Sequence, residues 1–248
     1  RPKNVSNLQL HSEQGTTASI YTGTYNGKKI IIKVFNTINE LKQLNEALLQ
    51  KKASTYLKSP EGINLFHEKL MFYTKDFSPV FNNGNLPKVY VPEIIDKGPF
   101  QEMTHRYNFS PSIPNSEGYV YLMEYIEEPT FYEVLKNREK DKIDLYSYWC
   151  DPNGGDHNYL QSILFALRDT LHNNNITHND LQFKNIMVKF NDQGYIDTMI
   201  LIDFGQAQPG NDEVGHDYEY NVFDIDGQLD KCRRRFPDKY NQDGKSSH

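Results

Sequence analysis

Two short runs decide the fold of this chain: ITHNDLQFKN at residues 176–185 and DFG at residues 203–205. The stretch between them is apolar at both ends and contains the turn-forming sequence NDQG at residues 191–194. This pattern predicts a β-hairpin. Asp203 follows Asn185 by 18 positions, so the two runs are separated by the length of one hairpin.

Taken together, the two runs resemble the protein kinase superfamily, in which a catalytic loop with the pattern D-x-x-x-x-N is followed by D-F-G. A lone D-F-G is usually a turn, but both patterns at this spacing favour the kinase interpretation. The resemblance implies that Asp180 orients or deprotonates the acceptor, while Asn185 and Asp203 bind Mg²⁺ against the triphosphate of ATP. Amide and carboxylate oxygens are hard ligands that suit this cation. His178 is expected to pack beneath the loop as a structural residue.

The N-terminal part of the chain supplies a further catalytic candidate. Residues 19–25 and 28–35 are rich in β-branched and aromatic side chains around Asn26-Gly27, which predicts a hairpin with a tight type I′ turn. Within its second arm, the sequence Ile-Ile-Lys33 resembles the kinase strand whose lysine contacts the α and β phosphates. Lys33 is therefore the expected phosphate ligand, although a lone strand lysine is more often simply exposed.

The residues before this hairpin resemble the glycine-rich loop of kinases, with Gly15 as its middle glycine. Ala18 stands where the third glycine would be, and Ile20 follows it. The resemblance places Gly15, Ala18 and Ile20 against the nucleotide. Gly15 still permits close approach of the backbone to phosphate.

In the kinase family a helix glutamate positions the phosphate-binding lysine. Helices are predicted at residues 38–57 and 61–72, and they carry Glu46 and Glu68 respectively. We favour Glu68 as the partner of Lys33, because the tyrosine and the Leu-Pro pair that follow its helix are similar to those of many divergent kinases. For either glutamate, the alternative is a solvated helix face.

A third apolar segment, residues 118–126, is predicted to be a buried strand that runs into a connector. Its end, LMEYI, resembles the kinase hinge. The resemblance implies that Met123 is the gatekeeper and that backbone groups of Glu124 and Ile126 read the adenine edge. The alternative is an ordinary core strand.

Strand patterns come first and helical patterns later, which together with the resemblance predicts an α+β, bilobal protein-kinase-like fold. Its β-rich N-lobe and hinge would span residues 1–126, with a helical and loop insertion at about 37–115, and its helical C-lobe would span residues 127–248. Pro, Gly and Asn are frequent at residues 76–114, so we expect mostly loop there. No Ala-Pro-Glu follows the D-F-G and 43 residues remain after Gly205, which predicts a reduced C-lobe.

Two substitutions depart from the kinase pattern. Asn179 replaces the arginine that commonly precedes the catalytic aspartate, so phosphorylation of the following loop is not expected to act as a switch. Gln182 replaces the lysine common in serine/threonine kinases, which leaves the class of acceptor open. The resemblance is therefore to a divergent, compact, eukaryotic-like kinase of viral or bacterial-effector type.

Composition bears on the kinds of partner and on the cellular compartment expected for the protein. The net charge of −6 argues against nucleic acid as the main partner. No apolar run is long enough to span a membrane. Cys150 and Cys232 fit no metal or redox spacing, which indicates free thiols in a reducing compartment such as the cytoplasm, or the host cytosol for a viral or effector protein.

The expected function is an ATP- and Mg-dependent phosphotransferase, specifically an atypical serine/threonine protein kinase. A small-molecule kinase, a minimal kinase or ATPase that works inside a complex, and a pseudokinase scaffold that binds ATP remain as alternatives. The expected partners are ATP, a protein or small-molecule acceptor, and an activating protein.

Overall fold

The computed structural model describes residues 1–14, 17–74, 86–136, 155–192 and 196–210. These form a mixed α+β structure with two compact units, Arg1–Ser54 with Pro92–Glu127, and Thr55–Val91 with Glu128–His248. The predicted α+β class is confirmed. The predicted boundary at 126–127 assigned residues 55–91 to the first part, whereas they belong to the second unit.

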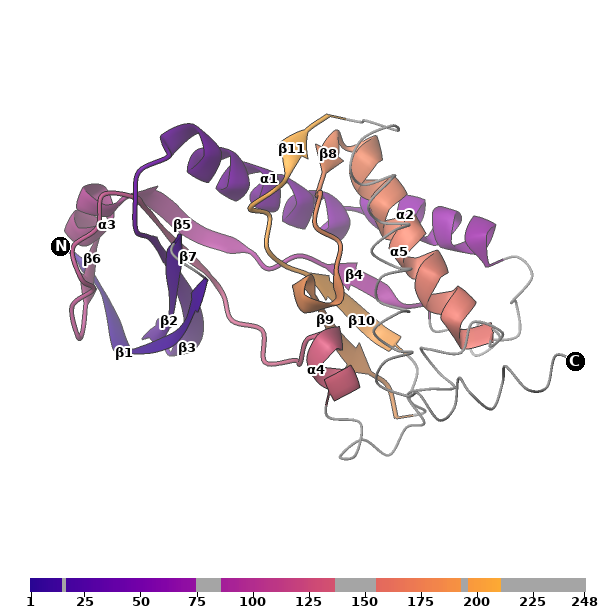
Figure 1. The fold of residues 1–248 in the computed structure, drawn as a ribbon, viewed down its shortest axis with the longest axis horizontal. Coiled ribbons are helices and arrows are strands. Elements are labelled where there is room, and N and C mark those ends of the chain that lie inside the picture. The colour runs from indigo at the N-terminus through magenta and orange to yellow at the C-terminus, as the bar shows by residue number, and fades with distance from the viewer. Residues whose placement is uncertain (15–16, 75–85, 137–154, 193–195, 211–248) are drawn as a thin grey trace, which may run out of the picture. The chain divides into compact units, whose positions relative to one another are not determined.

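A six-stranded sheet forms the first unit (Figure 1). Its order is β5-β7-β3-β2-β1-β6, and neighbouring strands are antiparallel except β1 and β6. The strands are β1 Lys3–Gln14, β2 Ala18–Tyr25, β3 Lys28–Phe35, β5 Ile94–Pro99, β6 Tyr107–Phe109 and β7 Tyr119–Glu124. Helices α1 (Glu40–Lys58) and α3 (Phe100–Arg106) accompany the sheet, although the last residues of α1 belong to the second unit.

The hairpin of β2 and β3 confirms the N-terminal prediction. Tyr25 pairs with Lys28, and the two residues between them, Asn26 and Gly27, have φ angles of 51° and 75°. A type I′ turn requires positive φ at both positions, and these two residue types adopt it with the least strain.

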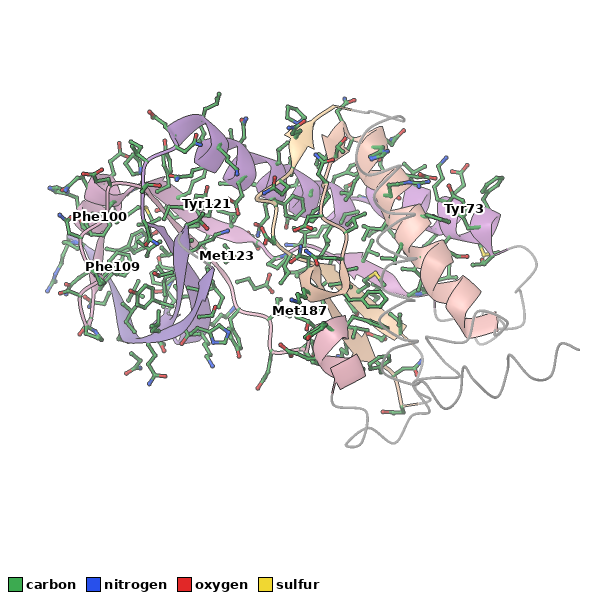
Figure 2. The ribbon with its side chains drawn as sticks, in the orientation of Figure 1. Tyr73, Phe100, Phe109, Tyr121, Met123 and Met187 are labelled. Atoms are coloured by element: carbon green, nitrogen blue, oxygen red, sulfur yellow. The ribbon has the colours of Figure 1, made fainter. Side chains whose placement is uncertain are left out.

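The sheet buries apolar side chains on both faces. On one face Ile32, Val120 and Leu122 pack with Phe100 and Phe109 (Figure 2). On the other face a smaller cluster joins α1 to the sheet; it consists of Ala18, Phe35, Ala47, Tyr119 and Tyr121.

The expectation of mostly loop at 76–114 is wrong for the described residues 86–114, which lie mainly in short strands and one helix. Residues 94–109 contribute β5, α3 and β6 to the first unit, and β5 is hydrogen-bonded to the central strand β7. Composition concealed these elements, because β5 contains Gly98 and Pro99 and α3 is only 7 residues long. Asp96 ties them together, since it accepts hydrogen bonds from Arg106 and Tyr107.

Helices α2 (Pro60–Tyr73) and α5 (Gly155–Asn173) run side by side in the second unit (Figure 1). α2 confirms the helix predicted at residues 61–72. Ser59 caps α2, because its hydroxyl accepts from the N–H of Gly62 at 3.1 Å. Gly62 itself is required by close packing, since a Cβ at this position would lie 2.0 Å from the carbonyl oxygen of Tyr56.

The second unit also contains short strands. β9 (Ile186–Phe190) and β10 (Ile196–Leu201) form the predicted antiparallel hairpin, and β4 (Lys88–Tyr90) pairs with β10 in parallel. β8 (Ile176–Thr177) pairs with β11 (Gln208–Pro209). The short helix α4 spans Phe131–Lys136.

Among the described helices, none combines the length and hydrophobicity that crossing a lipid bilayer requires. Cys150 and Cys232, on which the expectation of free thiols rests, lie outside the described residues.

Candidate functional site

The loop between β8 and β9 brings together two predicted catalytic-loop side chains, Asp180 and Asn185, and the substituted residue Gln182. It ends in a single 3-10 turn, Phe183–Asn185. Within the loop, the carboxylate of Asp180 accepts two amide hydrogen bonds. Asn185 donates to its Oδ2 at 2.7 Å and Gln182 donates to its Oδ1 at 2.8 Å. Both oxygens of the half-buried carboxylate are therefore held by neutral donors.

These contacts determine which way the side chain of Asn185 points. A carboxylate only accepts hydrogen bonds, so the NH₂ group of Asn185 must face Asp180, where it also donates to the backbone carbonyl at 3.0 Å. The amide oxygen Oδ1 is thus turned away from Asp180. Asn185 is buried, and within the described part of the chain this oxygen has no hydrogen-bond donor. A buried amide oxygen without a donor is suited to a ligand cation.

The end of β10 brings Asp203 close to the backbone of Asn185. The N–H of Ile202 donates to the backbone carbonyl of Asn185 at 2.9 Å, so the residue after Ile202 is fixed beside the loop. Asp203 has a φ of 59°, in the left-handed region, which Asp and Asn adopt more readily than other residues with a Cβ because their short side chains can hydrogen-bond locally. Its Oδ1 accepts such a local hydrogen bond from the N–H of Gly205 at 3.0 Å.

His178 connects the two runs from beneath. Its Nδ1 must accept, because the N–H of Asp180 donates to it at 3.1 Å; its Nε2 therefore carries the proton and donates to the carbonyl of Ile202 at 3.1 Å. The ring is fully buried and packs edge-on against Phe204, with centroids 4.8 Å apart. Both nitrogens of a neutral imidazole are used, which agrees with the structural role expected for His178.

The substituted position Asn179 also has a defined role in the structure. Its φ of 68° lies in the left-handed region, where asparagine is tolerated better than most residues. Its side chain donates to the carbonyl of Gln206 at 3.0 Å. Together with the pairing of β8 and β11, this neutral contact ties the segment after Asp203 to the loop.

Asn185 and Asp203 fit the chemistry of a magnesium site. They offer one buried amide oxygen and one carboxylate, and Mg²⁺ in nucleotide-binding sites typically takes one or two protein oxygens plus phosphates and water. Within the described residues no group of three or more His, Cys, Asp or Glu side chains could hold a metal without such help. The donor set therefore suits a cation that arrives with a nucleotide.

In the first unit Lys33 is bonded to Glu46 and not to Glu68. The Nζ of Lys33 lies 2.6 Å from Oε1 of Glu46, and both side chains are at least nine-tenths buried. Glu68 is exposed on α2, in the second unit. The predicted Lys33–Glu68 pair is wrong, because the helix that follows β3 directly, α1, buries Glu46 beside Lys33.

Polar anchors explain why α1 holds Glu46 in this position. Gln43, three residues before it, accepts from the N–H of Tyr119 and donates to a backbone carbonyl, while Gln50 donates to the carbonyl of Pro92 at 3.0 Å. Residues at this spacing share one helix face. The buried face of α1 therefore mixes these polar side chains with apolar ones such as Ala47, which an amphipathicity argument does not anticipate.

Strand register brings four of the predicted nucleotide-binding residues to one face of the sheet. Ile20 lies directly opposite Lys33, and Ile31 lies directly opposite Met123. Directly paired residues and residues two apart point to the same face, so Ala18, Ile20, Lys33 and Met123 share it. Tyr121, between Lys33 and Met123 on this face, is buried, and burial together with the charge of Glu46 raises the pKa of its hydroxyl (Figure 2).

The predicted hinge begins where β7 ends. Glu124 is the last residue of the strand, and its N–H donates to the carbonyl of Glu93 at 3.0 Å, so this N–H is already engaged within the protein. Ile126 lies after the end of β7. Gly15, which is also part of the predicted nucleotide site, lies outside the described residues.

The sequence offered Glu46 as the less favoured partner of Lys33, although its position on the helix that follows Lys33 directly was a signal for it. The hydrogen bond from Gln182 to Asp180 has no sequence signal beyond the two-residue spacing within one loop.

No protein-family model matches the chain, and no curated protein matches it either. Among solved structures, the chain is similar to vaccinia related kinase 3, with 15% sequence identity, a TM-score of 0.44, and coverage of 82% of this chain and 49% of that one. The chain thus spans about half the length of that structure.

Proposed function

We propose that this chain is a protein-kinase-like phosphotransferase that moves the γ-phosphoryl group of Mg·ATP to a hydroxyl, specifically a serine or threonine hydroxyl of a protein. In this proposal Lys33 contacts the phosphates and Glu46 holds Lys33. Asn185 and Asp203 bind the metal, and Asp180 faces the acceptor. The nucleotide is surrounded by Gly15, Ala18, Ile20, Met123 and the backbone groups of Glu124 and Ile126.

The observation that carries the proposal is the orientation of Asn185. Its NH₂ group is committed to Asp180, and its buried oxygen is directed away without a donor among the described residues. Asp203 is held in a left-handed conformation immediately after a backbone hydrogen bond to Asn185. In a purely structural loop a buried amide oxygen without a donor costs free energy, and a bound cation would remove that cost.

Mg²⁺, when bound by Asn185 and Asp203, would neutralise charge on the phosphates. Asp180 has two oxygens that each already accept one amide hydrogen bond, and each oxygen keeps a second lone pair. One of these can accept the acceptor hydroxyl. The hydroxyl oxygen then bonds to the γ-phosphorus, the bond from phosphorus to the ADP oxygen breaks, and the hydroxyl proton moves to Asp180.

Lys33 is suited to bind phosphate because its ion pair with Glu46 fixes the position of its ammonium group. A buried ammonium with one carboxylate at 2.6 Å is fixed in position, and two of its three protons are left to donate. The shared face of Ala18, Ile20 and Met123 supplies apolar surface beside it, as expected for the base and ribose of a nucleotide.

The acceptor is tested with γ-³²P-labelled ATP and Mg²⁺, first with generic protein substrates and then with a panel of hydroxylated metabolites. Label on serine or threonine of a protein supports the proposal as stated. Label on a metabolite moves the function to small-molecule kinases, and free phosphate alone indicates an ATPase. ATP binding with no released or transferred label contradicts the proposal and indicates a scaffold.

The matched variants are Asp180→Asn and Glu68→Ala. Asp180→Asn keeps the shape of the side chain but removes the negative charge that accepts the proton, so transfer is expected to fall by at least about 10²-fold. Glu68 is exposed on α2 and has no place in the proposed site. Its variant is expected to keep full activity.

A further inference from the structure

Gln182 occupies an unusual position, because it contacts the proposed acceptor-facing carboxylate directly. Its Nε2 lies 2.8 Å from Oδ1 of Asp180, on the opposite side of the carboxylate from Asn185, which holds Oδ2. Within the described residues the side chain of Gln182 makes no other hydrogen bond. The contact is therefore its single polar interaction there.

The backbone around Gln182 is fixed on both sides. Its N–H donates to the carbonyl of Asp180 at 2.9 Å, and its own carbonyl accepts from the N–H of Asn185 at 2.8 Å. A tight turn of this kind leaves little freedom for the side chain. Because a carboxylate only accepts, the amide nitrogen of Gln182 must face Asp180 and its oxygen must point away.

We propose that Gln182 is a positioning residue of the reaction: with Asn185 it clamps the carboxylate of Asp180 from both sides, so that the plane of the carboxylate is fixed towards the acceptor hydroxyl. This inference rests on the proposed function, and it adds a residue to it. One amide alone would fix one oxygen and leave the carboxylate free to swing about its terminal torsion, which has a broad energy minimum. Two amides determine the orientation of the group.

The chemical character of the clamp matters as well. Both donors are neutral, so the negative charge of Asp180 is not cancelled by a cation at residue 182. The side chain of Gln182 therefore positions Asp180 without adding positive charge beside the transferring phosphoryl group. That charge is left to Lys33 and to the bound metal.

Three substitutions separate positioning from structure. Gln182→Ala removes the donor and is expected to lower kcat about 10-fold, the loss expected for one hydrogen bond to a charged group, with the KM for ATP changed less than about 2-fold. Gln182→Glu keeps the shape but sets a second carboxylate against Asp180, so kcat should fall further. Gln182→Lys keeps a donor but sets a cation beside Asp180, so it should lose less kcat than Gln182→Ala without reaching the wild-type value.

A double-mutant cycle tests whether Gln182 acts through Asp180. If it does, Gln182→Ala should have no further effect on the residual kcat of Asp180→Asn, because the group that it positions is already inactive. Gln208→Ala, at an exposed glutamine in β11, is the matched control and should leave kcat unchanged. Additive losses in the cycle, or an equal loss for all three substitutions at 182, would overturn the proposal.

A readout without turnover separates this proposal from the proposed function. In ¹⁵N-labelled protein, the side-chain NH₂ resonance of Gln182, assigned by its loss in Gln182→Ala, should move in Asp180→Asn and stay fixed in Gln208→Ala. No movement overturns the clamp even if the wild type is active. Movement without any transfer in the wild type would overturn the proposed function, and with it the catalytic purpose of the clamp, while its hydrogen bond stands.

Discussion

Replacing Glu46 with alanine is expected to destabilise the first unit strongly. The ammonium of Lys33 and the carboxylate of Glu46 are 2.6 Å apart, and their side chains are 7% and 5% exposed. Removing one partner of a buried pair leaves the other charge without compensation, which typically costs about 3–5 kcal/mol of unfolding free energy. The ring of Phe35, 5.0 Å from Nζ, offsets little of this, so we expect a loss of about 3 kcal/mol.

The comparison with Glu68→Ala makes this prediction specific. Glu68 is exposed, and substitutions at such positions usually change the unfolding free energy by no more than about 0.5 kcal/mol. In urea unfolding followed by far-UV circular dichroism, a loss of about 3 kcal/mol lowers the midpoint by roughly 1–3 M for ordinary m-values. Glu46→Gln keeps an acceptor oxygen for Lys33 and should fall between the two variants.

A combined variant distinguishes the ion pair from packing. Lys33→Met with Glu46→Leu replaces the pair by apolar side chains, which is often neutral for stability. Recovery of most of the lost midpoint in the double variant supports a buried ion pair. Equal destabilisation by Glu46→Ala and Glu68→Ala would refute the assignment of Glu46 as the partner of Lys33.

Three further outcomes are expected. Burial, with a hydrogen bond to Asp169, raises the pKa of Tyr73 to about 12. The folded state therefore binds the Tyr73 proton more tightly than the unfolded state, and this stabilisation is lost as pH rises from 10 to 12. Tyr73→Phe should make the unfolding free energy fall less steeply over that range, and parallel pH curves for variant and wild type would contradict this. Gly62→Ala drives a Cβ into the carbonyl of Tyr56 and should cost about 2–3 kcal/mol in urea unfolding, whereas an unchanged midpoint would contradict the close approach. Asn185→Leu removes the amide oxygen and should raise the Mg²⁺ concentration needed for half-maximal ATP binding several-fold, measured by calorimetry against the wild type.

Local sequence patterns predicted the elements whose conformation depends mainly on neighbouring residues in the chain. Asn26-Gly27 could only be a tight turn between two strand-like arms, and the β9–β10 hairpin followed from the apolar runs around residues 191–194. These patterns depend on neighbours in the sequence. They also placed Asn185 and Asp203 one hairpin apart, which is why that part of the site was predictable.

Elements stabilised by distant contacts were not visible in the sequence. β1 alternates weakly and buries only a few side chains, among them Val5 and Leu8, yet it is a central part of the sheet because β2 and β6 pair with it. β5 contains Gly98 and Pro99, and its place at the edge of the sheet depends on pairing with β7. From composition alone, such segments are predicted to be loops.

The choice between Glu46 and Glu68 shows the same limit at the site. Both lie on helices, and the sequence offers each as a partner for Lys33. The decision is made by α1, whose buried face carries Gln43, Glu46 and Gln50 and is fixed by hydrogen bonds to backbone groups far along the chain. The periodic leucines predicted this helix but not its orientation, because Leu41 and Leu48 are exposed in the structure.

The most direct test of the central claim is the Mg²⁺-dependent turnover of ATP by Asp203→Asn. It is compared with turnover by the wild type and by Glu68→Ala at equal concentrations of folded protein. The variant keeps the size of the side chain and removes the charge of a proposed metal ligand, so phosphoryl transfer should fall by at least about 10²-fold while the circular dichroism spectrum stays the same. Full turnover by a folded Asp203→Asn protein would contradict the assignment of this cluster as a phosphotransfer site.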